Sequence, residues 1–484
     1  MATDLRASAS LIIAALAADG APPDEALELK RRGAEQLLRS GYIDAGLATL
    51  DEVLRSQGFV LAPSPRRALA SLLWRRFRLA VRGLDFVERP ASEVPPAQLR
   101  RIDVCWAVAV GLGIVDTVRG ADFQARHLEL ALDAGEPYRV ARALALEVGY
   151  TATGGVARAR ATAKRLRLAT SVAGRLTDPH VRGLVTLVSG VASALEGRFR
   201  EARDLTESAE AILREQCSGV AWELFNAQYF GLLSLAYLGE SDAIGVRLPG
   251  LLAEAEERGD LYAVTSLTTR IAYVSRLADD RPEEARDELR RAMGRWSRQG
   301  FHLQHLWALF AETEIDLYEG NGAQAWERID RDWAAVERSL LLRVQLIRIG
   351  ALQRHARAAL AAAGSAAPAE RERLLAAARR DARAIDRERA AWADPFAALV
   401  LAGAAALSGR RDEASRLLGQ AELGFQASQL SAHAAATRWR RGERLEGEEG
   451  RRLCESAEAW MAERGVVRPE RLVSMLAPGL DPPG

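Results

Sequence analysis

The chain has 484 residues, a formal net charge of +1 and an isoelectric point near 7.8. This balance argues against a nucleic-acid-binding domain, which usually carries a basic excess. The three cysteines, Cys105, Cys217 and Cys454, are too few and too far apart for a disulfide framework or a metal cage, and they favour a reducing, cytoplasmic setting. No apolar run approaches the ~20 residues that cross a bilayer, so no membrane span is expected.

The N-terminal region contains an apolar stretch, Leu11–Ala18, shortly after Arg6. A basic residue before an apolar run is a feature of signal peptides. Here the stretch is short and Asp4 offsets Arg6. We therefore expect the first helix of an array rather than a secretion signal.

The rest of the chain predicts an all-α fold. Ala, Leu, Arg and Glu fill long segments with apolar residues at three- and four-residue spacing, and β-branched alternation is rare. The clearest expected helix pairs are 24–40 with 43–56, 178–196 with 199–215, 219–238 with 241–258, 260–277 with 282–299, and 302–319 with 323–339.

A repeated signature marks the turns inside these pairs: a Gly or other turn residue, then a small residue, often Ala, five positions later. It occurs at Gly41, Gly135, Gly197, Gly239, Asp280, Gly320 and Gly409. Gly ends a helix in a left-handed conformation, and the small residue permits close helix contact. The four turns from Gly197 to Gly320 are separated by 42, 41 and 40 residues. Two repeats fit before Gly409 if Gly364 marks a turn, so the period of about 40–45 residues indicates a helical solenoid.

Two regions depart from this period. Residues 66–82 predict a helix, and the proline-containing segment 83–96 predicts an irregular insertion. We expect the repeat array to span residues 1–438. Residues 439–484 are expected to form a C-terminal cap with a helix at 455–463 and an extended tail.

The stretch Leu187–Leu213 resembles the tetratricopeptide repeat, because Gly190, Gly197, Phe199, Ala202 and Ala209 match its small and aromatic positions. The resemblance implies a right-handed superhelix of antiparallel helix pairs. The period exceeds the 34 residues of that repeat, so the helices are expected to be longer.

A second resemblance covers nearly the whole chain. The segments Gly33–Leu47, Ala121–Ala141, Cys217–Phe225 and Met475–Gly479 resemble the C-terminal helical region of large serine/threonine kinases of myxobacteria and their relatives. In such proteins a kinase domain and an ATPase module precede the array. The resemblance implies a sensory or scaffold arm and transfers no catalysis.

The two lysines of the chain, Lys30 and Lys164, lie outside any phosphate-binding GxxxxGK[ST] loop, and the HRD and DFG strings of kinases do not occur. Neither catalysis nor a cofactor is therefore expected. Gly111–Asp116 contains a fragment of a dinucleotide-binding fingerprint, but it lacks the third Gly and a preceding strand, so helix packing explains it better. His302 and His305 lie on one helical face, where a helix-start pair is favoured over a metal site.

Two surfaces are candidates for binding. Basic and aromatic residues alternate around Arg75, Arg76, Arg78 and Arg82, where either an anionic partner or a solvated helix face is expected. The first helix of each pair lines the groove of a tetratricopeptide array, which places eight residues there: Asn226, Tyr229, Tyr237, Arg270, Trp307, Phe310, Glu314 and Tyr318. Aromatic and Arg side chains of this kind anchor peptides, although they also suit the core between repeats.

The expected function is therefore a non-catalytic interaction or sensory arm that binds a protein or peptide, with a kinase or ATPase module as one candidate. Two alternatives stay open. The chain could be a fragment of a serine/threonine kinase whose catalytic modules lie outside it, or the array of a transcription regulator.

Overall fold

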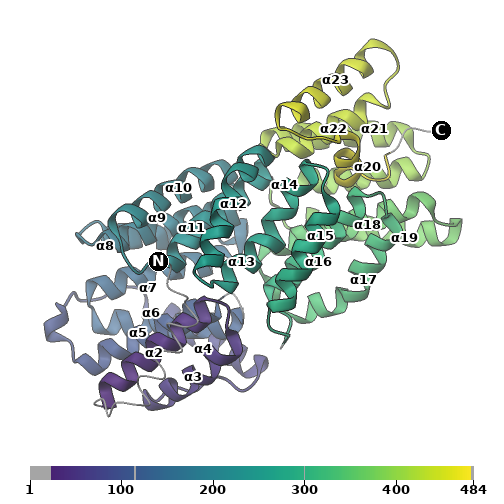
Figure 1. Ribbon diagram of the computed structural model, residues 1–484. Coiled ribbons are helices and arrows are strands. Elements are labelled where there is room, and N and C mark those ends of the chain that lie inside the picture. The colour runs from purple at the N-terminus through teal and green to yellow at the C-terminus, as the bar shows by residue number, and fades with distance from the viewer. Residues whose placement is uncertain (1–22, 114–115, 299, 481–484) are drawn as a thin grey trace.

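The computed structural model describes residues 23–113, 116–298 and 300–480, and in this part of the chain every regular element is helical (Figure 1). The apolar stretch Leu11–Ala18 and the last residues of the expected tail lie outside the described residues. No described helix combines the length and the hydropathy that a membrane crossing requires.

The N-terminal third begins with the pair α2 and α3 and the single helix α4. The elements are α2 (Pro23–Arg39), α3 (Ile43–Ser56), α4 (Pro65–Arg82), η1 (Ala91–Glu93), α5 (Pro96–Leu112), α6 (Thr117–Ala134), α7 (Pro137–Ala152), η2 (Gly155–Arg158) and α8 (Ala159–Ala173). The expected irregular insertion at residues 83–96 is present, with one short 3₁₀ turn, η1, inside it.

The remaining two thirds repeat one unit, a first helix followed by an antiparallel second helix. The elements are α9 (Pro179–Leu195), α10 (Phe199–Gln216), α11 (Ala221–Leu238), α12 (Ser241–Glu257), α13 (Leu261–Leu267), η3 (Thr268–Ala272), α14 (Tyr273–Ala278), α15 (Pro282–Arg295), α16 (Leu303–Tyr318), α17 (Gly322–Arg338), η4 (Leu341–Arg343), α18 (Gln345–Ser365), α19 (Pro368–Asp386), α20 (Asp394–Leu407), α21 (Arg411–Ala427), α22 (Ser431–Gly442), α23 (Gly447–Glu463) and α24 (Pro469–Leu476). Figure 1 shows these pairs stacked side by side from the teal to the yellow end of the chain.

The turn residues explain where the helices end. Gly41, Gly197, Gly239, Gly320 and Gly409 all have φ between 75° and 85°, the left-handed region that glycine enters without a steric cost. Asp280 takes the same role with φ 55°. The small residues five positions after these turns are buried, as the signature predicts; Ala202 and Ala325 are 0% exposed.

Two expected turns differ from the structure. Gly364 lies inside α18, and the chain turns only at Ala366 and Ala367, where Pro368 begins the next helix. Gly364 follows a run of alanines, which favour continued helix, so one Gly does not stop it. Gly135 is left-handed but joins α6 to α7, which lie in successive pairs.

The C-terminal part also differs from the expected cap. Position 438 falls inside α22, and α22 packs against α23 as another helix pair. The helix expected at 455–463 begins eight residues earlier, at Gly447. The paired helices therefore continue to Glu463, and α24 packs against α16 and α22.

First and second helices differ in burial. The 18-residue first helix α11 has twelve buried residues, whereas the 18-residue second helix α10 has five, which recur at helical spacing on one face. First helices are thus covered on most sides and second helices on one side. Packing of this kind places the first helices inside the molecule and the second helices on its surface.

Segments far apart in sequence also touch. The backbone N–H of Gln345 donates to Thr153 O, and its side chain accepts from Val156 N. A Cβ placed on Gly197 would contact Trp392, and one on Gly239 would contact Ala432. The last two contacts join residues 195 and 193 positions apart, so helix pairs that are distant in sequence lie against each other.

Candidate functional site

A cavity of about 220 Å³ lies between the first helices. We call it the central cavity. Its walls come mainly from the first helices α5, α7, α9, α11, α16 and α18 and from η3, and Thr117 of α6 and Leu341 of η4 complete them. Its lining is mainly apolar and aromatic and includes Val110, Leu146, Tyr150, Val191, Trp222, Tyr229, Phe230, Leu233, Tyr237, Arg270, Trp307, Ile347 and Arg354.

A second cavity of about 110 Å³ adjoins it towards α22 and α24. Tyr237, Arg270 and Arg354 line both cavities and so stand between them. The second cavity also contains Glu314, Arg357 and His433. The interior of the array therefore combines apolar walls with a small group of buried charges.

Glu314 is the acid of this group and is 3% exposed. Arg354 Nε lies 2.8 Å from its Oε1, and Arg357 donates to the same oxygen. Burial alone would raise the pKa of Glu314, but the two guanidinium groups lower it below its ordinary value. Each nitrogen of Arg357 has an acceptor, because the side chain also donates to Gln353 Oε1 at 2.7 Å and to Met475 O at 2.8 Å.

Arg270 is the unusual member. It is 6% exposed, and no described carboxylate lies within ion-pair distance of it. Its guanidinium carbon lies 5.0 Å from the Trp307 ring centroid and 5.7 Å from that of Tyr237. Its Nε–H has no acceptor among the described residues. Aromatic faces attract a cation, but they do not replace a counter-ion.

The local backbone at Arg270 is also unusual. Residues Thr268–Ala272 form a π-helical turn, η3, between α13 and α14. The sequence predicts one uninterrupted helix over 260–277, with no sign of this turn. Such wide turns inside a helix occur frequently at functional sites, since they shift a side chain out of the regular helical register.

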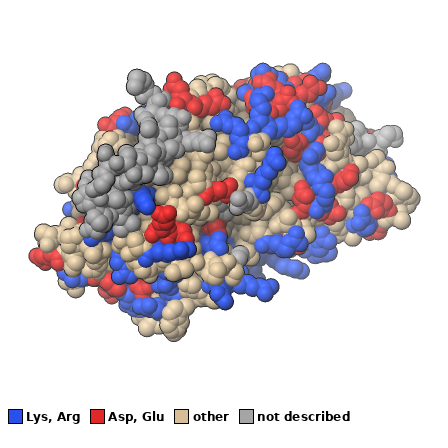
Figure 2. All heavy atoms as spheres, turned by 60° about the horizontal axis from the view of Figure 1, so that its bottom comes forward, with Lys and Arg blue, Asp and Glu red and all other residues tan. Residues whose placement is uncertain are grey.

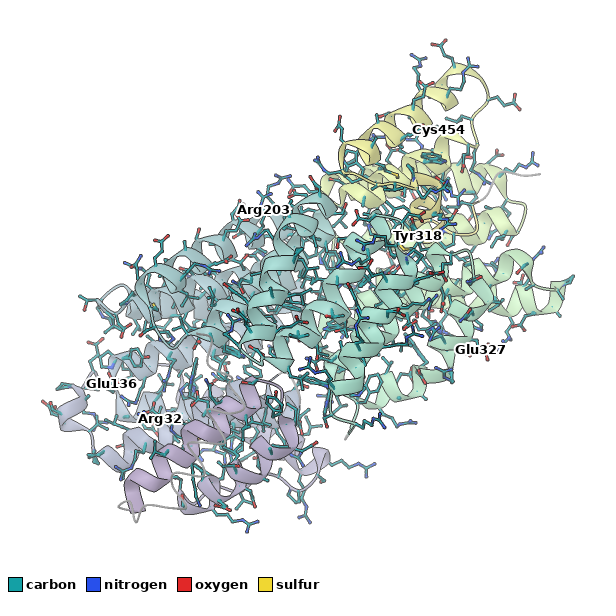
Figure 3. All side chains as sticks on the ribbon, in the orientation of Figure 1. Arg32, Glu136, Arg203, Tyr318, Glu327 and Cys454 are labelled. Carbon is teal, nitrogen blue, oxygen red and sulfur yellow. The ribbon has the colours of Figure 1, made fainter. Side chains whose placement is uncertain are left out.

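The structure separates the eight expected groove residues into two sets. Tyr229, Tyr237, Arg270 and Trp307 line the central cavity, and Glu314 lines the adjoining one. Asn226, Phe310 and Tyr318 line neither cavity. Asn226 donates to Trp222 O, and Phe310 lies under the Arg354 guanidinium. Tyr318, labelled in Figure 3, donates to Asp280.

The four arginines of the expected basic face are all paired with acids. Arg75 and Arg78 lie against Glu129, Arg76 against Glu147, and Arg82 against Asp133. These acids are on α6 and α7, so the arginines hold α4 onto the fold. The sequence pattern does not reveal this pairing, because the acids lie about fifty to seventy positions away.

His302 and His305 form the start of α16. The His305 Nδ1 accepts from the His302 backbone N–H at 3.0 Å, and His302 Nδ1 accepts from Trp296 Nε1 at 3.2 Å. Burial lowers the pKa of His305 to about 4. Among the described residues, no cluster of three or more His, Cys, Asp or Glu side chains is suited to a metal ion.

A polar groove near α7 and α9 contains an arrangement that the sequence did not indicate. Tyr138 Oη lies 3.0 Å from His180 Nδ1, and His180 Nε2 lies 3.3 Å from Glu223 Oε1. Cys217 lines the same groove, where burial raises the pKa of its thiol. A raised pKa leaves the thiol protonated at neutral pH, which is unlike an activated nucleophile.

No protein-family model matches the chain, and a search of curated proteins returned no similar sequence.

Proposed function

We propose that the chain is a non-catalytic binding arm of a signalling protein and that the inner side of its helix array receives the partner. The observation that supports this is the central cavity, whose walls come mainly from the first helices. Concave, mostly apolar sites with a few polar groups are the usual form of binding sites.

The array is proposed to be a tetratricopeptide-like, right-handed superhelix. The left-handed turn residues and the buried small residues after them support the repeat. Two contacts support the winding of the array into a superhelix. Gly197 lies against Trp392, and Gly239 lies against Ala432. The two sequence separations are nearly equal, so successive units contact units at a nearly constant distance along the chain.

The partner is proposed to be a protein or peptide, with a linked kinase or ATPase module as one candidate, and the setting cytoplasmic. Basic and acidic residues are interspersed on the face in Figure 2, which favours such a partner over nucleic acid. Kinase linkage rests on the sequence resemblance. In-frame kinase and ATPase modules in the upstream DNA would support it, and a downstream DNA-binding domain would favour the transcription regulator.

Site-specific photocrosslinking tests the inner side. The photoreactive residue p-benzoylphenylalanine is placed at Tyr237, a partly buried cavity residue of α11, or at Val246, which is 83% exposed on α12. After irradiation in lysate of the source cells, an adduct specific to position 237 is expected. Adducts from position 246 alone would place the partner on the outer surface and contradict the proposal.

A further inference from the structure

The buried charges around the two cavities do not balance. Arg270, Arg354 and Arg357 are 6%, 7% and 2% exposed, and Glu314 is the buried acid beside them. Glu314 forms ion pairs with Arg354 and Arg357, and Arg270 has no carboxylate within 4 Å among the described residues. Burying an unpaired cation is costly, so an anion at this position would remove a real penalty.

Residues that line the central cavity carry buried hydrogen-bond donors without an acceptor in the described structure. They include the Arg270 Nε–H and the Trp307 Nε1–H. The two side chains are stacked, with the guanidinium carbon 5.0 Å from the indole centroid. A carboxylate is the group that accepts from both, because it offers two oxygens and a negative charge.

The rest of the wall suits an apolar body. Trp222, Phe230, Leu233, Leu146 and Ile347 line the same space. Its volume of about 220 Å³ is below the ~300–1,000 Å³ of sites for drug-sized ligands, so the occupant is small. The nine helical elements that contribute to its walls favour a free molecule over the end of a folded or extended chain.

We infer that the central cavity binds a small organic acid, with its carboxylate on Arg270 and Trp307 and an aromatic or branched apolar body against Trp222 and Phe230. This inference rests on the proposed function: the protein partner is received on the inner side of the array, and the small acid that the binding arm senses occupies the cavity within that side. The acid would supply the counter-ion that Arg270 lacks.

Calorimetric titration of the full chain with 4-phenylbutyrate tests the inference, with 4-phenylbutan-1-ol as a matched neutral probe. The acid should bind about tenfold or more tightly than the alcohol, as expected for a hydrogen bond to a charged group. Arg270→Gln should remove this preference and keep weak binding of both probes. Arg270→Lys, which keeps the charge, should retain part of it.

The matched control is Arg331→Gln, a change on the outer helix α17 at a side chain that is 64% exposed. It should bind both probes as the wild type does. Circular dichroism and melting curves establish that each variant is folded before titration.

Three results would overturn the inference: no binding of 4-phenylbutyrate to the folded wild type, equal affinity for acid and alcohol, or an undiminished preference in Arg270→Gln. The inference would also be overturned if the peptide Ala-Ala-Ala-Ala-Phe bound through its free carboxylate as tightly as 4-phenylbutyrate, because the site would then be assigned to a chain terminus. The photocrosslinking result is independent of these titrations, so a failed acid site and a failed binding arm are distinguishable.

Discussion

Gly197 and Trp392 lie against each other although 195 positions separate them: a Cβ on Gly197 would be 2.1 Å from Trp392 Cδ1. The indole is 5% exposed and packs edge-on against Phe199, Tyr237 and Phe396, so it has little room to move. One glycine therefore serves two purposes, because it forms the turn between α9 and α10 and admits the side chain of a distant unit.

Gly197→Ala should destabilise the protein strongly. The left-handed conformation, φ 82°, costs an L-residue about 1–2 kcal/mol, and the clash with Trp392 adds an overpacking penalty of about 1–3 kcal/mol. The matched control is Gly409→Ala, with φ 75° and no atom within 4 Å of the added methyl. Urea unfolding should show the larger loss for Gly197→Ala; equal losses would mean that the Trp392 contact is absent.

Ala202→Trp should damage the contact between α9 and α10. Ala202 is 0% exposed, and an indole exceeds the volume that the helix pair can accept, so a loss above about 3 kcal/mol is expected. Because each unit stabilises its neighbours, the melting transition should broaden or split. Ser208→Trp, at an exposed position of the same helix, should change stability by at most about 0.5 kcal/mol.

The sequence predicted most of the helix pairs because their determinants are local. Gly197 and Ala202 lie within one turn signature, and the apolar positions of α10 recur at helical spacing. It did not predict the contact of Gly197 with Trp392, since contacts between distant units leave no periodic pattern. The expectation for Gly364 was wrong because a fixed period was imposed on a longer helix.

The site was only partly accessible from sequence for the same reason. Counting back from each turn placed Tyr229, Tyr237, Arg270 and Trp307 on first helices, and these residues line one cavity. Counting from the turns could not show that Arg270 has no carboxylate within ion-pair distance among the described residues, or that it lies in a π-helical turn. Ion pairing depends on which helices meet in space, and the turn is one extra residue in a continuous helix.

The purified chain should neither bind magnesium–ATP nor hydrolyse ATP. Lys30 pairs with Glu52 at 2.7 Å and Lys164 is exposed on α8, and neither lies in a phosphate-binding loop. Calorimetric titration with magnesium–ATP should give no saturable heat. Saturable binding that disappears in Lys30→Ala or Lys164→Ala would contradict this prediction.

Arg357→Met should cost much more stability than Arg270→Met. Loss of Arg357 removes bonds to Gln353 and Met475 and leaves Glu314 with one partner, and breaking a buried pair costs about 3–5 kcal/mol. Loss of Arg270 leaves no carboxylate of the described residues unpaired, so a change within about 1 kcal/mol is expected. Urea unfolding of both variants makes the comparison, and equal losses would indicate an acidic partner for Arg270.

His433 should make the protein sensitive to acid. Burial, and then the neighbouring Arg357, lower the pKa of His433 to about 3, and its Nδ1 has no hydrogen-bond partner. Glu314 and Arg354 face it from α16 and α18 and have opposite effects on this pKa. The unfolded chain takes up a proton near pH 6.5 and the folded chain only near pH 3. Stability is therefore unaffected by this group above pH 6.5 and falls as the pH drops from 6.5 towards 3.

At pH 5 the expected loss from His433 is about 2 kcal/mol relative to pH 7. His433→Gln removes the titrating group, so the comparison is between the pH slopes of the two proteins rather than their absolute stabilities. Asp260, whose pKa is raised to about 6 by burial, opposes this trend in both proteins and cancels in the difference. Urea unfolding at pH 7, 6 and 5 should show a smaller decline for the variant. Parallel declines would mean that the pKa of His433 is the same in the folded and the unfolded protein.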